Sequence, residues 1–404
     1  MIFTMAWRNI WRNKMRSLVI MFSITVGLFA GIDILALYRG MINARIRTVI
    51  DAEVGHLQIH DARFTQDYDP KFIVSNGPEA LYAIRKLPAV KAAAARSVSF
   101  GMLATATGSS GVQINGILLE QENELSQLDK KITEGNLLNN ARKNEVLIGK
   151  KLAKKMKLKC RSKLVLTFTD TTGGIVSGAF RVAGIYQSAN APLDERNVYI
   201  RMVDMNSLLN IGASFHEIAV LLKKDDALPS TQRSLEQLLP RYKIENWKEI
   251  SPETDLLVKT TNQLSFILMA IIMLALAFGI INTMLMAILE RTREIGMMVA
   301  LGTTKIKIFL MVLLETTFLT LAGAPLGILI GWMLTEYYAK HGLDLSGMGR
   351  EMMSSFGYST TIYPEFPSDK FVGVLLIVFA TAIVSSLLPA KKALQLQPVQ
   401  ALRR

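Results

Sequence analysis

The sequence predicts a multi-pass α-helical membrane protein with four transmembrane helices and a large α+β domain outside the membrane between helices one and two. Half of the 404 residues are hydrophobic and the mean hydropathy is +0.29, yet 20% of the residues are charged. Four segments are long and apolar, and a long polar stretch separates the first from the other three. A chain with this composition lies partly in lipid and partly in water.

Each predicted span has the roughly 20 apolar residues that a helix needs, at about 1.5 Å per residue, to cross a hydrocarbon core of about 30 Å. The first span follows a basic flank as a signal peptide would, but it is longer than a usual signal-peptide core and has no small-x-small cleavage site close behind it. We therefore expect it to be a retained anchor. The predicted spans are residues 17–37, 264–289, 308–335 and 371–388.

Basic residues at the span ends predict the orientation. They gather before the first span, between the second and third, and after the fourth, so these regions and both termini are expected in the cytoplasm. The basic residues just after the first span, Arg39, Arg45 and Arg47, would favour the opposite orientation. They begin a long segment, however, and such a segment is translocated largely regardless of its charge. We expect a multi-pass protein of the cell inner (cytoplasmic) membrane. The basic residues are Arg8, Arg12, Lys14 and Arg16; Arg291, Arg293, Lys305 and Lys307; and Lys391, Lys392, Arg403 and Arg404.

Three regions follow from the spans. Residues 1–40 are predicted to form an N-terminal helix and the first span. Phe3, Trp7, Ile10 and Trp11 share one face of the N-terminal helix, which suits this helix to the membrane surface. The extracytoplasmic (periplasmic) domain is predicted at residues 41–262. The region that follows, residues 263–404, would contain the other three spans, a short cytoplasmic helix at 290–304 and a C-terminal tail.

The outer domain is predicted to mix strands and helices. Alternation of apolar and polar residues predicts strands at 54–60, 112–119, 163–169 and 217–221, and helical patterns occur at 78–87, 149–158 and 230–239. The polar residues 254–263 are expected to continue the second span outward as a helix. Cys160 is the single cysteine, so no intrachain disulfide can form and the domain needs its own apolar core.

The cytoplasmic loop between spans two and three has the most informative pattern. As a helix, residues 290–304 bring Glu290 close to Arg293 and Glu294 and place Ile295, Met298 and Leu301 along one apolar edge. An apolar edge bounded by charges suits docking into a groove on another protein. A solvated loop lying on lipid headgroups is the alternative, and spacing alone leaves both open.

The loop resembles that of ABC transporter permeases of the family that includes the macrolide-efflux, lipoprotein-releasing and cell-division permeases. The family pattern of Glu-Ile-Gly followed by Ala-Leu-Gly stands here as Glu294-Ile-Gly296 and Ala300-Leu-Gly302. The resemblance covers the whole topology. Two further matches are the C-terminal Pro389-Ala-Lys-Lys-Ala393 with Pro398-Val-Gln-Ala-Leu402, and the N-terminal Ala6-Trp-Arg-Asn-Ile10 with Arg12-Asn-Lys14.

The resemblance implies that the loop is a coupling helix seated in an ABC ATPase dimer. No phosphate loop of the form Gly-x4-Gly-Lys-Ser/Thr occurs in the sequence, so we expect a separate partner chain to bind ATP and Mg²⁺. This chain is then expected to be non-catalytic and to hold no cofactor. The implied coupling residues are Glu290, Arg291, Arg293, Glu294, Ile295, Gly296, Met298, Ala300, Leu301 and Gly302.

Within the family, the absence of a fused ATPase and the size of the outer domain favour the lipoprotein-releasing type. The segments Gly116-Ile-Leu-Leu-Glu120 and Ile132-Thr-Glu-Gly135 also resemble that type. The resemblance implies release of lipoproteins from the inner membrane to a periplasmic lipoprotein carrier, with a second permease copy or a paralogue as partner. Two alternatives stay open: a signalling permease that activates a cell-wall hydrolase, and a permease for small-molecule or peptide efflux.

Two sets of residues within the spans are candidates for packing and transport. Gly27 and Gly31 in span one, and Gly323, Gly327 and Gly331 in span three, recur every fourth residue and predict close helix contacts within the subunit or across a dimer. Flexible positions are the alternative. Gly27 and Gly31 are expected to interrupt span one, so acyl chains of a lipid-anchored cargo could leave the bilayer through a gate beside this span. The residues expected to line this gate are Phe22, Val26, Phe29 and Leu37.

Several other functions are not expected. The net charge of +13 does not indicate nucleic-acid binding, because no basic stretch is interleaved with aromatic residues. His56 and His60 share a strand face but lack a third ligand, so no metal site is expected. The four histidines and one cysteine provide no catalytic set. For Asp33 and Glu315, which lie within spans, a structural role is favoured over a proton or substrate site.

Overall fold

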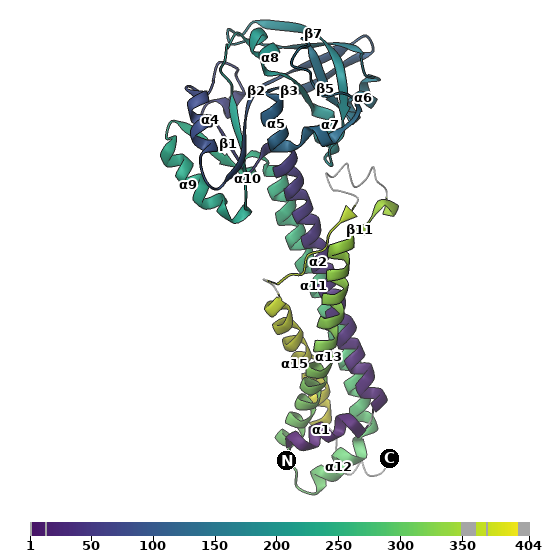
Figure 1. Cartoon of the computed structure of the whole chain (residues 1–404). Helices are drawn as coiled ribbons and strands as arrows, with labels where there is room; N and C mark the ends of the chain where they lie inside the picture. The colour runs from purple at the N-terminus through teal and green to yellow at the C-terminus, as the bar shows by residue number, and fades with distance from the viewer. Residues whose placement is uncertain (1, 13, 349–360, 369–370, 395–404) are drawn as a thin grey trace. The chain divides into compact units, whose positions relative to one another are not determined.

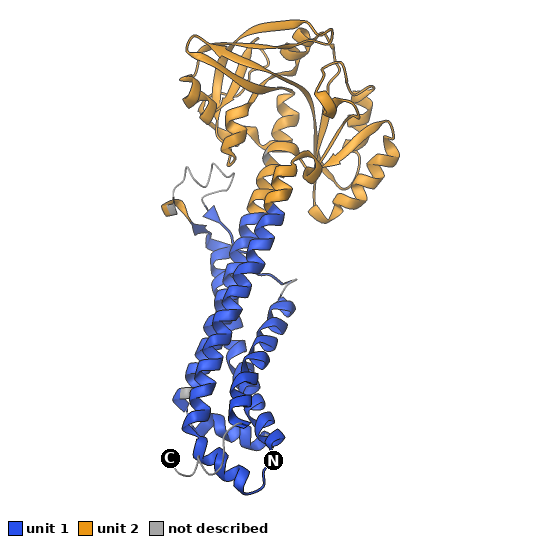
Figure 2. Ribbon diagram, turned by 180° about the vertical axis from the view of Figure 1, so that it is seen from behind, with its two compact units in different colours: residues 1–42, 258–344, 361–404 blue, residues 43–257, 345–360 orange. Residues whose placement is uncertain are grey.

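The computed structural model describes residues 2–12, 14–348, 361–368 and 371–394. The chain divides into two compact units, coloured separately in Figure 2. Unit 1 comprises Met1–Ile42, Val258–Asp344 and Thr361–Arg404, and unit 2 comprises Asn43–Leu257 and Leu345–Thr360.

Unit 1 is built from long helices that are apolar enough to cross a membrane (Figure 1). Four candidate membrane helices occur in the described part of the chain, which confirms the predicted fold class. They extend beyond the predicted spans, and the expected helical continuation at 254–263 is present because α11 begins at Pro252. The helices with residues in unit 1 are α1 (Ile2–Arg12), α2 (Lys14–Val49), α11 (Pro252–Glu290), α12 (Thr292–Ala300), α13 (Lys305–His341) and α15 (Phe371–Leu394).

The core of unit 1 follows from helical spacing. On α2, every fourth residue from Ile20 to Ile32 is buried and packs in one apolar cluster with side chains of α11, α13 and α15. Other apolar side chains on the same helices, such as Phe22 on α2 and Phe278 on α11, are exposed. A helix that is apolar on both its packed and its exposed faces suits a lipid environment.

Unit 2 contains a ten-stranded, mostly antiparallel sheet with helices around it (Figure 1). The strand order is β10-β1-β9-β2-β3-β8-β5-β7-β4, and β6 pairs with β2 and β7. The strands are β1 (Leu57–Asp61), β2 (Val90–Thr105), β3 (Gly108–Ile117), β4 (Ile132–Gly135), β5 (Glu145–Gly149), β6 (Lys163–Thr169), β7 (Ile175–Tyr186), β8 (Asn197–Arg201), β9 (Glu217–Leu222) and β10 (Tyr242–Asn246).

The long strand β2 joins two apolar cores within unit 2. Its first part pairs with β9, and its second part pairs with β3 and β6. One core lies around β1, β9, α4 and α9, and the other around β3, β5 to β8, α6 and α8. The α-helices of this unit are α3 (Phe64–Asp67), α4 (Gly77–Arg85), α5 (Leu119–Ser126), α6 (Lys150–Met156), α7 (Ala191–Arg196), α8 (Met202–Leu209), α9 (Leu228–Leu238) and α10 (Trp247–Ile250).

The predicted strands and helices of the outer domain are present, with shifted boundaries; the strand expected at 112–119, for example, is β3, which covers Gly108–Ile117. The strand expected at 54–60 begins only at Leu57, because Ile50–Val54 continue α2 as a π-helical turn. Gly55 ends this turn at φ +75°, and its N–H donates to the carbonyl of Ile50. This left-handed backbone favours glycine, and it separates the π-helical turn from the strand.

Candidate functional site

The helix α12 lies in the loop between α11 and α13 and is bounded by two breaks in the helical backbone. Arg291 separates it from α11, and Gly302 ends it with φ +89°. The N–H of Thr303 donates to the carbonyl of Met298 at 2.9 Å, and that of Gly302 donates to the carbonyl of Val299 at 3.0 Å. These bonds satisfy carbonyls at the helix end in a conformation that favours glycine.

Three ion pairs involve the beginning of α12, and two of them connect it with neighbouring helices. Arg291 Nη1 lies 3.2 Å from Glu315 Oε1 on α13, and Arg291 Nε lies 3.3 Å from Glu294 Oε2. Glu294 also forms an ion pair with Arg12 at the end of α1. Partial burial raises the pKa of Glu294, but Arg12 and Arg291 outweigh it and hold the pKa below its usual value. The charged residues therefore link α12 with α1 and α13.

The apolar edge expected on this helix is divided between its two faces. Ile295 is buried in the core of unit 1, and Met298 packs partly against that core, whereas Leu301 is 87% exposed. The exposed apolar side chains are Met297 and Leu301, which lie four residues apart. The prediction of a single edge through Ile295, Met298 and Leu301 is therefore wrong, because α12 turns Ile295 toward the membrane helices.

Sequence reasoning missed Met297, although its spacing held the signal. Arg293, Met297 and Leu301 follow one another at intervals of four, so they form one stripe on a helix. All three are exposed. The other coupling candidates take different positions: Gly296 is buried, Ala300 and Gly302 are exposed, and Glu290 ends α11.

A cavity of about 480 Å³ lies between α1, α12 and the adjacent ends of α11 and α13. Its lining is rich in methionine, an unbranched side chain that repacks easily. Such a lining can accommodate a change in the position of α12. The methionines are Met5, Met284, Met297, Met298 and Met311.

The helix α1 packs on α13 through its aromatic residues. The ring of Phe318 lies 4.7 Å from that of Phe3 and 5.8 Å from that of Trp7, measured between centroids. Trp7 and Trp11 are each about half exposed, as expected for a helix at the membrane surface. Ile10 is buried, so it does not share the exposed aromatic face.

The glycine rows lie at helix contacts within the chain. A Cβ atom at Gly323 would lie 2.9 Å from the carbonyl oxygen of Met21 on α2, and one at Gly327 would lie 2.7 Å from that of Thr25. Gly331 faces Ile32 on the same helix. Gly27 and Gly31 of α2 face another helix, α11, at Leu276 and Met269.

The candidate gate residues lie on an unbroken helix. Phe22 and Val26 are 69% and 42% exposed, while Phe29 and Leu37 are partly buried. The expectation that Gly27 and Gly31 interrupt span one is wrong, because α2 runs continuously from Lys14 to Val49. These glycines lie against side chains of α11 instead of breaking the helix.

The carboxylates within spans have partners. Glu315 pairs with Arg291, and Asp33 accepts a hydrogen bond from Thr335 Oγ1 at 3.3 Å. In unit 2, His56 and His60 contact different carboxylates, Asp225 and Glu245. Across the described ranges, no group of three or more His, Cys, Asp or Glu could hold a metal ion.

The described part of the chain thus combines four candidate membrane helices, an exposed helix between the second and third of them, and a large domain inserted between the first and second. Residues 17–238 match the family model of the MacB-like periplasmic core domain, and residues 266–398 match that of the FtsX-like permease C-terminal region. The chain therefore belongs to the ABC transporter permeases with FtsX-like and MacB-like domains. The C-terminal motif at 398–402 lies outside the described residues.

Curated relatives resemble the chain over different lengths. The macrolide export ATP-binding/permease protein MacB of Shigella sonnei is 26% identical over 427 residues, which cover 99% of this chain and 60% of the relative. An uncharacterized ABC transporter permease of Methanocaldococcus jannaschii is 26% identical over 232 residues, or 55% of each chain. This chain thus spans 55% to 60% of the length of these relatives.

Several solved structures are similar to part of the chain, and one of them illustrates the extent of the match. It is the periplasmic region of MacB from Actinobacillus actinomycetemcomitans, with 17% sequence identity and a TM-score of 0.37. The match covers 55% of this chain and 97% of that structure.

Proposed function

We propose that this permease couples ATP hydrolysis by a separate ABC ATPase dimer to motion of unit 2 and thereby releases lipoproteins from the inner membrane. In this proposal the chain is non-catalytic, both termini are cytoplasmic, and ATP and Mg²⁺ are bound by the partner. The observation that carries the coupling is the geometry of α12. It presents Arg293, Met297 and Leu301 outward while its first turn is tied to α13 by the Arg291–Glu315 pair.

Force on α12 has a direct covalent and ionic route to the long helices. Arg291 lies between α11 and α12 in the chain, and its guanidinium contacts α13. The helix α11 has 39 residues, about 58 Å at 1.5 Å per residue, and contributes residues to both units. A continuous helix of this length is suited to conveying displacement from the cytoplasmic loop to the outer domain.

The surface of α2 supports lipid-anchored cargo. Phe22 and Val26 are exposed one helical turn apart, and the partly buried Phe29 continues their face. Each acyl CH₂ that is kept from water contributes about 0.8 kcal/mol, so an apolar path beside α2 would lower the cost of extracting a lipid anchor. A second permease copy or a paralogue would complete that path, and a periplasmic carrier would receive the lipoprotein.

Efflux of a small molecule or peptide is the second candidate. It is supported by the match to a macrolide export ATP-binding/permease protein along 99% of this chain. The two candidates differ in the cargo that the exposed face of α2 would contact.

Depletion of the protein, followed by an inventory of inner-membrane lipoproteins, tests the proposal. Lipoproteins should accumulate in the inner membrane and return to normal when the wild-type protein is restored. A Met297→Asp variant, inserted at the same level, should fail to restore release. If no lipoprotein accumulates and tolerance to macrolides or peptides falls, efflux replaces lipoprotein release.

A further inference from the structure

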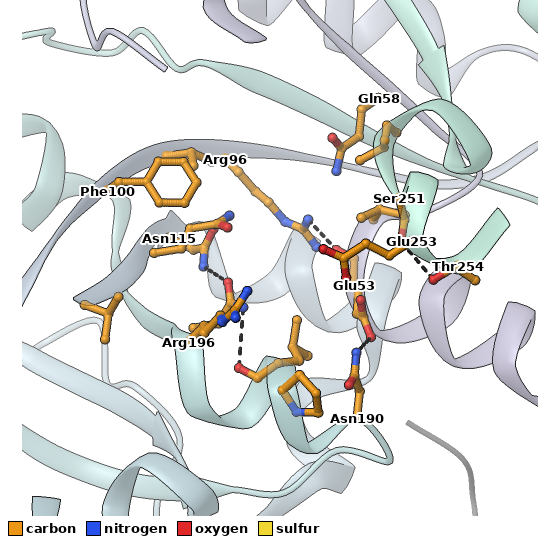
Figure 3. Close-up of a pocket in the computed structure, with 18 of the residues that line it drawn as sticks. Glu53, Gln58, Arg96, Phe100, Asn115, Asn190, Arg196, Ser251, Glu253 and Thr254 are labelled. Carbon is orange, nitrogen blue, oxygen red and sulfur yellow. Dashed lines mark hydrogen bonds between the residues drawn. The ribbon is translucent and has the colours of Figure 1, made fainter. Parts of the chain in front are cut away.

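Unit 2 contains a cavity of about 760 Å³, lined by both polar and apolar residues, that the coupling site does not use (Figure 3). Its walls come from strands β2 and β3, from residues 190–197, and from the unit 2 ends of α2 and α11. A ligand here would contact both parts of the outer domain and both helices that leave it. Cavities where several substructures meet are preferred positions for ligands.

One wall is a strip of side-chain amides on the β2–β3 pair. Antiparallel pairing places Val98 opposite Asn115 and Phe100 opposite Gln113. Gln113 Nε2 donates to Asn115 Oδ1 at 3.0 Å, and Asn115 Nδ2 donates to Asn197 Oδ1 at 3.0 Å. This chain of hydrogen bonds fixes the orientation of the amides, and Figure 3 labels Asn115, which lies in the middle of the chain.

The charged residues of the cavity balance one another. Arg96 is buried, and its guanidinium contacts Glu122 at 2.7 Å, Glu217 at 3.3 Å and the carbonyl of Glu53 at 2.8 Å. Three arginines and three glutamates line the cavity, so their formal charges cancel. A neutral ligand fits this balance better than an anion or a cation. The six residues are Arg45, Arg96, Arg196, Glu53, Glu217 and Glu253.

A buried acceptor in the lining has no hydrogen-bond partner. Asn190 is 4% exposed, and its Nδ2 donates to Glu53 Oε1. Its Oδ1 has no hydrogen-bond partner among the described residues. Exchanging the amide oxygen and nitrogen of Asn190 would place its oxygen against the carboxylate oxygen of Glu53, so Glu53 fixes the orientation of the Asn190 amide. A buried acceptor of this kind is costly unless a donor reaches it.

Two exposed aromatic rings adjoin the amides. Tyr68 and Phe100 line the cavity, with ring centroids 4.8 Å apart, and are 41% and 48% exposed. Their rings offer an apolar surface beside polar groups, and the charged and amide side chains of the lining disfavour an acyl chain. Pyranose rings combine these requirements, with apolar C–H faces and hydroxyls at their edges.

We propose that this cavity binds a neutral saccharide. Each sugar hydroxyl both donates and accepts hydrogen bonds, so it can pair with either the donors or the acceptors among the polar side chains of the lining. A peptide backbone offers only one donor and one acceptor per residue, and successive residues are about 3.3 Å or more apart when extended. The proposal does not depend on the cargo of the permease.

Gly111 is a position at which a larger side chain can fill the cavity and so test the site. It lines the cavity, and a Cβ added there would have no heavy atom within 4 Å. Gly111→Trp should therefore fill the space, while Gly111→Ala changes the same strand position without blocking it. Phe100→Ala is a second variant, and it removes an exposed ring without leaving a hole in the core.

The experiment uses the full chain in lipid nanodiscs and saturation-transfer NMR with maltotriose and chitotriose, with the tripeptide Ala-Ala-Ala as comparison. At least one trisaccharide should bind saturably to the wild type and to Gly111→Ala. Its affinity should fall about tenfold or more in Gly111→Trp, because the cavity is filled, and in Phe100→Ala, because an aromatic contact is lost. The tripeptide should not bind.

Absence of binding by both trisaccharides to the folded wild type would overturn the proposal. Equal binding to all four proteins would place the sugar elsewhere and would also overturn it. Saturable binding of the tripeptide alone would assign the cavity to peptides. If Gly111→Trp does not fold, as judged by its thermal unfolding, the Phe100→Ala result decides.

Discussion

Arg291 and Glu315 are 24 residues apart in the sequence, yet Arg291 Nη1 lies 3.2 Å from Glu315 Oε1, and each side chain is only 11% exposed. The pair joins the residue before α12 to the third turn of α13. It thereby fixes the direction in which α12 leaves α11, and with it the face on which Met297 and Leu301 stand. Disrupting the pair should alter both stability and coupling.

Replacing Glu315 by Gln should destabilise the protein. Removing one member of a buried ion pair leaves the other charge uncompensated, at a cost of about 3 kcal/mol or somewhat less because Glu294 also contacts Arg291. The double variant Arg291→Met/Glu315→Leu should recover most of that loss. Thermal unfolding in nanodiscs measures both, and a single variant as stable as the wild type would contradict the assignment.

Exposed and buried apolar residues of α12 should respond differently to a charge. Met297→Asp should leave thermal stability unchanged but weaken co-purification of the ATPase and abolish transport-coupled ATP hydrolysis, because only an exposed contact is altered. Ile295→Asp should lower stability by several kcal/mol, about 3 or more, since a carboxylate would enter the core. Normal coupling in a folded Met297→Asp protein would remove Met297 from the docking surface.

Gly327→Leu should separate α2 from α13. A Cβ atom at this position already meets the carbonyl of Thr25 at 2.7 Å, so a larger side chain must displace the helix backbone. Gly279→Leu on α11 is a matched control, because a Cβ there has no heavy atom within 4 Å. The melting temperature should fall only in the first variant. Equal behaviour of the two would show that the α2–α13 contact contributes little.

The stability of unit 2 should depend on the protonation of Asp194. Burial raises the pKa of Asp194 from 3.8 to about 7, although hydrogen bonds from Ser188 act to lower it. The folded protein thus binds this proton more tightly than the unfolded chain does. Ionisation destabilises the fold, so the penalty is full above pH 7, is relieved as the pH falls toward 4, and is absent below that.

Asp194→Asn removes this ionisation and should stabilise the protein at pH 8 by a few kcal/mol, about 2 to 4. It should also flatten the change in stability between pH 4 and 7. Asp226→Asn, at an exposed position, serves as control. Chemical denaturation at several pH values measures the difference, and parallel pH profiles for wild type and Asp194→Asn would exclude the effect.

Cysteine labelling tests the proposed orientation. In a Cys160→Ser background, cysteine at Ile175 should react with a membrane-impermeant thiol reagent in intact spheroplasts, because this position in unit 2 is 79% exposed. Cysteine at Leu301, which is 87% exposed on the loop, should react only after the membrane is opened. The reverse pattern would invert the topology.

Sequence alone predicted the elements that depend on local composition. The strand 163–169 coincides with β6 because alternation of burial extends over its whole length. The orientation of α12, which buries Ile295 and exposes Leu301, was not predictable in this way, because it depends on contacts with Arg12 and Glu315 from distant helices. Likewise, the 760 Å³ cavity of unit 2 was not predictable, because its lining residues are scattered in the sequence between Arg45 and Leu257 and do not form a local motif.

The chain enters and leaves unit 2 at nearly the same point. Arg45 Nη2, near the end of α2, donates to Thr254 Oγ1, near the start of α11, at 3.3 Å. A domain whose ends meet can be inserted into a helical hairpin or exchanged for another without changing how that hairpin closes. This arrangement makes the outer domain a replaceable module, so a graft that keeps the Arg45–Thr254 junction could change what the transporter recognises.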